Sequence, residues 1–429
     1  MEKIAASLLA TAGIACAQTY NYDSSSETLV ITGKGNTVAD RITPEEPITP
    51  GSTVPGTSEI FGDTKEIILK DVWTSPDSIR IKYVEPTSEG NNTTLKLENS
   101  RLGASGDFDK GGTGLILILD SQSRLDLFGN RLTNTIRIEN QGHISCSNST
   151  VRENSYLWDN KTTTGSSGVL GGSGYYRFGN VSSIETDKDF GLIKTSGQIT
   201  DLEISGIYNV DGNSAKTIGD DAYIVGVNTS SSSDGQAMTI SGSLTIEAKQ
   251  GTGIGILANQ LGSDDVSLKN DYSGQIYVTA KDAFGVKVGK NAAKDPSAAG
   301  DIYSLSVGGL DINNTITSGS TQGEATGIYA KSVKRDLTAD AITVEGYTSA
   351  TGIHLTEGGR NLTISDMQVS ARNATATGII AARGIDTPVP TAGKLENIRI
   401  DNLEVSGGAD ATGIFANSIT KSGQSENII

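Results

Sequence analysis

The stretch that decides the fold runs from residue 350 to residue 380 and reads ATGIHLTEGGRNLTISDMQVSARNATATGII. It begins and ends with Ala-Thr-Gly-Ile, and aliphatic residues alternate with polar ones between the two copies. Leu362 and Ile364 form one aliphatic pair, and Met367 and Val369 form a second pair two residues further on. Alternation with a period of two places these four side chains on one face of short β-strands. The stretch therefore predicts a unit of three short strands, the third of them at Thr-Gly-Ile.

This unit recurs along the second half of the chain. A glycine followed by an aliphatic residue marks each copy, and the glycines are Gly191, Gly226, Gly255, Gly285, Gly327, Gly352, Gly378 and Gly413. The last four copies share Ala-Thr-Gly-Ile, and the intervals between their glycines are 25, 26 and 35 residues. We expect the residues that follow these four glycines to stack in one inward column. They are Ile328, Ile353, Ile379 and Ile414.

Repetition at this period predicts a solenoid. One unit of three short strands cannot bury its apolar face alone, whereas stacked units close a continuous aliphatic core. Corners between strands need residues that tolerate positive φ, which fits the Gly, Asn and Asp found there. The sequence therefore predicts an all-β protein, a three-faced parallel β-helix with irregular N-terminal rungs. The alternative is a β-sandwich or a sheet of hairpins, which would show two-residue Asn-Gly or Asp-Gly turns between strands of similar length.

The chain divides into four regions. Residues 1–17 are expected to be a signal peptide, and residues 18–65 an N-terminal strand (Thr28 to Thr32) and a proline-rich loop at 41–57. Residues 66–190 are expected to form irregular rungs, with the polar, glycine-rich residues 147–180 as an irregular loop or a weakly formed turn of the β-helix. Residues 191–429 are expected to form the regular repeats. The final SENII resembles the start of LENIRI at 395–400, so the last rung is expected to be truncated.

The N-terminal segment has the layout of a secretory signal. Lys3 precedes an apolar stretch from Ile4 to Ala17, and Ala15-Cys16-Ala17 matches a small-x-small cleavage site. Two alternatives remain open, a lipoprotein with lipid on Cys16 and a plain N-terminal helix. No later run approaches the ~18 apolar residues of a membrane helix.

Composition excludes several function classes. The chain has 50 Asp and Glu against 34 Lys and Arg, a net charge of −16, so a nucleic-acid partner or an anionic membrane surface is not expected. Cys16 and Cys146 are the only cysteines, and His143 and His354 are the only histidines. Cys16 lies in the signal-like segment, so the mature chain is expected to keep only Cys146, which cannot form an internal disulfide or a cysteine zinc site. The two histidines are far apart in sequence and no local signature surrounds them, so a Ser/His or Cys/His catalytic pair is not expected. No motif for a cofactor or a metal is present.

Few residues suggest catalysis. Some β-helices act on polysaccharides with clustered carboxylates, and Asp201 with Glu203 and Glu396 with Asp401 are candidates for such pairs. An acidic chain scatters carboxylates everywhere, however, so a solvated surface is the favoured interpretation. Trp73 and Trp158 are the only tryptophans that could stack on sugar rings. His354 follows Ile353, so alternation predicts that it points outward as an exposed spacer.

The Ala-Thr-Gly-Ile units, the signal-like start, the low cysteine content and the acidic Ser/Thr/Gly/Asn-rich composition support one resemblance. Over most of residues 18–429 the chain resembles the passenger region of bacterial type V autotransporters. The resemblance implies a right-handed β-helix on, or released from, the surface of a Gram-negative cell. The C-terminal membrane barrel of that family is expected to be missing from this sequence. The Gly-Asp-Ser-Gly context of the family's serine proteases is absent.

These observations predict an exported, non-catalytic adhesin or structural module. Its expected partner is a protein or glycan on a host or neighbouring cell, or a second copy of itself. The alternative function is a β-helical polysaccharide lyase or glycoside hydrolase. A cleft with clustered carboxylates and an aromatic wall would favour the enzyme, whereas a bare rod with Ser/Thr ladders would favour the adhesin.

Overall fold

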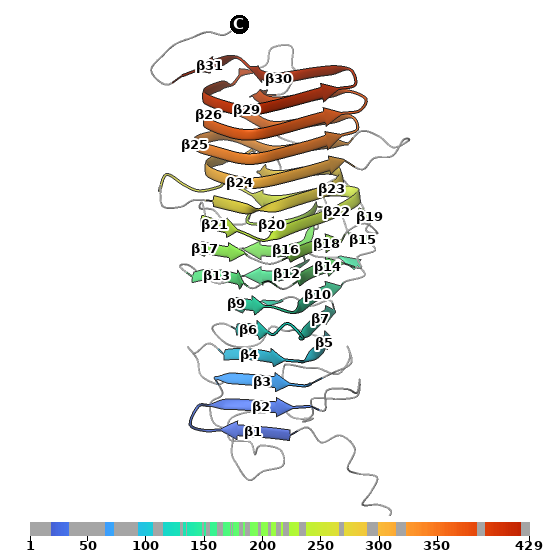
Figure 1. Ribbon diagram of the computed structural model, residues 1–429, viewed down its shortest axis with the longest axis vertical. Coiled ribbons are helices and arrows are strands. Elements are labelled where there is room, and N and C mark those ends of the chain that lie inside the picture. The colour runs from blue at the N-terminus through green and yellow to red at the C-terminus, as the bar shows by residue number, and fades with distance from the viewer. Residues whose placement is uncertain are drawn as a thin grey trace, which may run out of the picture.

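The computed structural model describes residues 19–33, 65–72, 93–105, 115–128, 132–133, 135–147, 150–151, 155–160, 166–171, 173, 175–179, 183–184, 189–195, 199–204, 207–211, 216–217, 223–230, 237–265, 270–289, 299–314, 323–383 and 391–421. Several features singled out in the sequence lie outside these residues. They are the signal-like segment with Cys16, the proline-rich residues 41–57, Trp73 and the final SENII. Within them the protein is all-β, with strands stacked into an elongated rod that runs from β1 to β31 (Figure 1). This part of the chain contains no helix.

The strands are short in the first half of the chain and long in the second. The first half contains β1 (Thr19–Asp23), β2 (Thr28–Thr32), β3 (Glu66–Lys70), β4 (Thr93–Glu98), β5 (Arg101–Ser105), β6 (Leu115–Leu119), β7 (Arg124–Phe128), β8 (Leu132–Thr133), β9 (Thr135–Asn140), β10 (His143–Ser147), β11 (Thr150–Val151), β12 (Ser155–Asn160), β13 (Ser166–Gly171), β14 (Tyr175–Gly179), β15 (Ser183–Ile184), β16 (Asp189–Thr195), β17 (Ile199–Ile204), β18 (Ile207–Asp211) and β19 (Lys216–Thr217). The second half contains β20 (Tyr223–Asn228), β21 (Ala237–Ile240), β22 (Ser243–Ala258), β23 (Asn270–Val288), β24 (Asp301–Asn314), β25 (Glu324–Gly346), β26 (Ser349–Ala371), β27 (Thr375–Arg383), β28 (Thr391–Ala392), β29 (Lys394–Gly407), β30 (Asp410–Ala416) and β31 (Ser418–Thr420).

Parallel pairing arranges most of these strands in ladders. The first ladder passes through β2, β3, β4, β6, β9, β13, β17 and β21 to the start of β23. The second passes through β5, β7, β10, β14, β18 and β22. The third passes through β8, β12, β16, β20 and β22. From β22 onward a single long strand contributes to consecutive ladders, so each new turn of the chain repeats the one before it.

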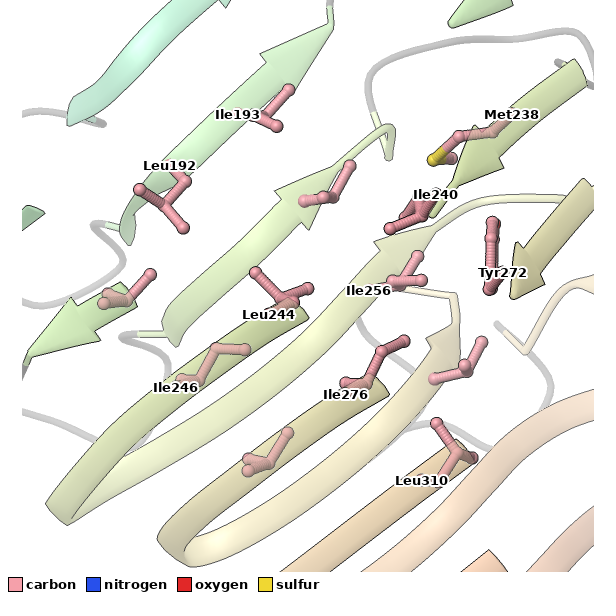
Figure 2. Packing of buried hydrophobic residues seen from close by; sticks show 14 of the residues in the cluster. Leu192, Ile193, Met238, Ile240, Leu244, Ile246, Ile256, Tyr272, Ile276 and Leu310 are labelled. Atoms are coloured by element: carbon pink, nitrogen blue, oxygen red, sulfur yellow. The ribbon is translucent and has the colours of Figure 1, made fainter. Parts of the chain in front are cut away.

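The core consists of the inward side chains of all three ladders. Leu362, Ile364, Met367 and Val369 are buried, as the alternation in the sequence predicted. Figure 2 shows the equivalent residues of earlier rungs, with Met238 and Ile240 pointing into the same apolar interior as Ile256. Burial of such aliphatic side chains is the main driving force for folding here, at about 25 cal/mol per Å² of apolar surface.

Asparagine and aspartate form the corners where the chain turns between strands. Asn361 and Asn397 have positive φ values of 48° and 54°. The Asn397 amide donates to Asn361 Oδ1 at 2.9 Å, and the Asn361 amide donates to Asp336 Oδ1 at 3.0 Å. Asparagine tolerates the left-handed region better than other side-chain-bearing residues, and here its amide also bonds to the next corner. The corner chemistry expected from the sequence is therefore present.

One region differs from its prediction. Residues 147–180 were expected to form an irregular loop or a weakly formed turn of the β-helix, but they contain the strands β11, β12, β13 and β14. β12, β13 and β14 pair in parallel with strands on both sides, for example Trp158 with Leu132 and with Ile193. The loop alternative was wrong because Tyr156, Leu157 and Trp158 are all buried, so the strand does not show simple alternation.

The N-terminal end carries a cap that the repeat pattern did not indicate. β1 pairs with β2 in the antiparallel direction, with Tyr22 opposite Leu29, and both side chains are buried. An antiparallel strand cannot continue the parallel ladder, and it covers the backbone edge that β2 would otherwise expose.

Candidate functional site

The repeat glycines and isoleucines are packing positions. Ile328, Ile353, Ile379 and Ile414 lie in parallel register, and the first three are fully buried. A Cβ added to Gly255, Gly285, Gly327, Gly352 or Gly378 would lie 2.5 or 2.6 Å from the carbonyl oxygen of the next glycine in the column. Real Cβ atoms do not approach a backbone oxygen so closely, so only glycine fits. None of these residues offers a reactive group.

Of the candidate carboxylate pairs, the structure describes the side chains of Glu396 and Asp401, and each of them pairs with a different arginine. Glu396 accepts from Arg360 at 3.1 Å, and Asp401 accepts from Arg399 at 2.9 Å. Each carboxylate thus has its own arginine on the surface, an arrangement that contributes little to stability. Asp201 and Glu203 lie in β17, and their side chains fall outside the described part of the molecule.

Trp158 is not a sugar platform. Its side chain is fully buried and belongs to the main apolar core. Stacking on a sugar ring requires an exposed aromatic face, so this tryptophan is a core residue.

His354 is placed as expected but is not exposed. It lies in register with Tyr329 and Ile380, in the outward column of the third ladder. Its ring packs edge-to-face on Tyr329 with 4.9 Å between centroids, and its Nε2 lies 3.4 Å from the Ala382 carbonyl oxygen. Burial lowers the pKa of His354, although the contact with Ala382 opposes that shift. The expectation of an exposed spacer was wrong because the Tyr329 ring and the end of β27 at Ala382 pack against this outward position.

A second apolar cluster, separate from the core, explains this covering. Its members are Tyr156, Tyr223, Val225, Ile254, Leu257, Phe284, Ala299 and Tyr329. We call their positions the outer cluster of the third ladder. Strands with both faces buried have continuous apolar runs in their sequence, and Tyr-Ile-Val-Gly-Val in β20 is such a run. That run is the sequence signal that could have revealed the outer cluster.

Lys287 is buried beside this cluster with 1% of its surface exposed. Its Nζ lies 4.7 Å from the centre of the Phe284 ring and 5.0 Å from that of Tyr223, and it has no hydrogen-bond partner among the described residues. Burial lowers the pKa of Lys287 from 10.5 to about 8, while the charges of Asp282 and Glu324 oppose the shift. The two rings offset part of the cost of desolvating the ammonium group.

The lowered pKa of Lys287 predicts that the stability of the folded protein depends on pH. In the unfolded chain Lys287 keeps its proton up to pH 10.5, whereas in the folded protein it loses the proton near pH 8. Folding therefore releases a proton between these values, so the stability of the native protein rises with pH across that window. We expect Lys287→Met to be more stable than the native protein by about 2 kcal/mol at pH 7. That advantage should shrink between pH 8 and pH 10.5.

Urea unfolding followed by circular dichroism, at pH 7, 9 and 10.5, measures this difference. Lys334→Met is the matched control, because the Lys334 side chain is 40% exposed and pairs with Asp301 on the surface. If the stability gained by Lys287→Met stayed the same at all three pH values, the prediction that Lys287 loses its proton on folding would be wrong.

The second ladder presents a different surface. In β23 the exposure alternates strictly from Asn270 to Val278, and Gln275 and Tyr277 point outward. Tyr277 is 38% exposed and lies in register with Thr245 on one side and Asp311 on the other. Asn313, two residues after Asp311, donates its amide to Glu345 Oε2 at 3.5 Å. Burial and the nearby Glu345 charge raise the pKa of Asp311.

No family model, curated protein or solved structure matches this chain. The functional interpretation therefore rests on its own residues. Within the described ranges, no three His, Cys, Asp or Glu residues come together in a way that could hold a metal ion. A membrane-crossing helix is likewise not found in that part of the chain.

Proposed function

We propose that the chain is a right-handed, three-faced parallel β-helix of the autotransporter-passenger type. It is exported to the surface of a Gram-negative cell and acts there as an adhesin or interaction module. The parallel ladders support the helix, and the right-handed preference of connections between parallel strands supports its handedness. The expected partner is a protein or glycan on another cell, or a second copy of the module.

The observation that carries this proposal is the regular repetition of the rungs between Glu324 and Ala416. β25 pairs with β26, and β26 with β27 and β29, in one register apart from irregularities between Ala330 and Leu337, so similar outward positions recur in consecutive rungs. An enzyme needs one unusual rung with convergent groups, whereas an adhesive surface gains from many similar ones. The carboxylates of this region that we considered, Glu396 and Asp401, are engaged by separate arginines.

Deletion of one whole rung tests the proposal. Removal of residues 327–351 joins Thr326 to Gly352, and the register is kept because Thr326 and Thr351 are partners in the ladder. We expect beads coated with the purified deletion protein to attach less to cultured epithelial cells, and a second rung deletion to lower attachment further. Single outer substitutions such as Arg399→Ala or Glu404→Ala should change attachment by less than about twofold, because exposed polar contacts contribute little individually.

Circular dichroism of each deletion protein controls for loss of the fold. Turnover of a polysaccharide such as polygalacturonate, abolished by one carboxylate substitution, would contradict the adhesin and support the polysaccharide-active enzyme.

A further inference from the structure

Tyr277 stands out on the second ladder. Only Tyr277 and Phe415 are exposed large apolar residues in the described part of this chain, whose aromatic content is 5%. Phe415 lies on β30 near the end of the described residues, where β30 pairs with β27, whereas Tyr277 lies in the middle of the rod with paired strands on both sides. A tyrosine on a regular strand that is paired on both sides is held in place more rigidly than one on a loop.

The neighbours of Tyr277 are all polar and can form hydrogen bonds. Gln275 and Thr279 flank it along β23, and Thr245 and Asp311 flank it across the ladder. A side chain at Gly309 would collide with the Gln275 amide, so the glycine leaves space for that amide to lie across the neighbouring strand. The amide is therefore held against the sheet near Tyr277, with its donor and acceptor available.

The chemistry of this surface fits a sugar ring. A pyranose has an apolar C–H face and a rim of hydroxyl groups, so it can stack on an exposed aromatic ring while amides and carboxylates bind its hydroxyls. Strands about 4.8 Å apart bring such groups within reach of one sugar unit. Asp311 and Glu345 add negative charge on the neighbouring rungs, which disfavours an acidic sugar.

We propose that the outer surface of the second ladder, formed by Tyr277, Gln275, Asp311 and Asn313, binds a neutral glycan. One pyranose ring stacks on Tyr277, and the three polar side chains bind its hydroxyl groups. The proposal rests on the surface-module function above and names the chemical class of its partner. It also sets Tyr277 apart from the distributed polar positions, because an aromatic anchor contributes far more than a single exposed hydrogen bond.

The test uses the full chain, labelled and applied to an array of neutral and acidic glycans. The strongest neutral hexasaccharide is then titrated by calorimetry. We expect neutral glycans to bind and oligogalacturonate not to bind. Tyr277→Ala should weaken the titrated affinity about tenfold, and Tyr277→Phe should stay within about threefold because its ring still stacks. Phe415→Ala, which removes an equally exposed ring from the third ladder, should have no effect.

Binding to acidic glycans alone, no binding to any glycan, or equal affinities of Tyr277→Ala and the native protein would each overturn the proposal. The bead assay distinguishes failure of the glycan site from failure of the proposed adhesive function. If the array and the titration show no Tyr277-dependent glycan binding while native beads still attach to cells, the glycan site is wrong and the surface module stands. If native beads do not attach while the glycan still binds with the expected Tyr277 dependence, the adhesive function is wrong and the glycan site stands.

Discussion

Alanine at Gly352 is expected to lower the free energy of unfolding by about 3 kcal/mol. The added Cβ would lie 2.5 Å from the Gly378 carbonyl oxygen and 2.7 Å from Met367 Sδ. The oxygen belongs to the backbone of the next rung, which is held at ladder spacing by its own hydrogen bonds, so it cannot move away locally. Two rungs would have to separate to admit one methyl group.

Gly413 provides a matched control within the same column. Its Cβ would meet Leu403 Cδ2 at 3.5 Å, which is ordinary contact, and no other atom of the described residues lies within 4 Å. We expect Gly413→Ala to change stability by less than about 0.5 kcal/mol. Urea unfolding of both variants measures the difference. If both substitutions changed the free energy of unfolding equally, the repeat glycines would be required for backbone conformation and not for the close approach of neighbouring rungs.

A charge at position 364 should have the other large effect. Ile364 is fully buried and lies in register between Ala339 and Ile400, so aspartate there would place a carboxylate between two apolar rungs. We expect Ile364→Asp to cost about 4 kcal/mol and to make the rod sensitive to protease.

The adjacent residue is the control for that substitution. Thr363 is half-buried on the opposite side of the strand, in register with Thr338 and Arg399. Thr363→Asp should therefore be nearly silent, since its carboxylate lies beside solvent and the Arg399 column. Similar losses of protease resistance from both substitutions would mean that the inside and outside of the strand have been exchanged.

The sequence by itself determined the repeat and its register. Ile328 pairs with Ile353 at the 25-residue interval of their glycines, and Ile353 pairs with Ile379 at 26. Alternation also identified which side chains of Leu362 to Val369 are buried. These features are readable because they depend on each residue and its near neighbours along a strand, and because every rung repeats the same local solution.

The structure of two segments could not be predicted from local sequence patterns. The strands in residues 147–180 contain little periodicity, so only their pairing with neighbouring rungs shows that they are strands. The antiparallel cap at β1 depends on which edge it meets, and a five-residue strand does not encode its own direction.

Only the tertiary structure decided what lies outside the rod. Alternation directs both Tyr277 and Tyr329 outward, yet Tyr277 is 38% exposed and Tyr329 is 9% exposed. Lys287 meets Tyr223, a residue two rungs earlier in the third ladder, at a distance that no local pattern specifies. Whether an outward side chain is exposed depends on the segments that pack over it. Those segments are remote in sequence, so the core was predictable whereas the candidate glycan surface and the buried lysine were not.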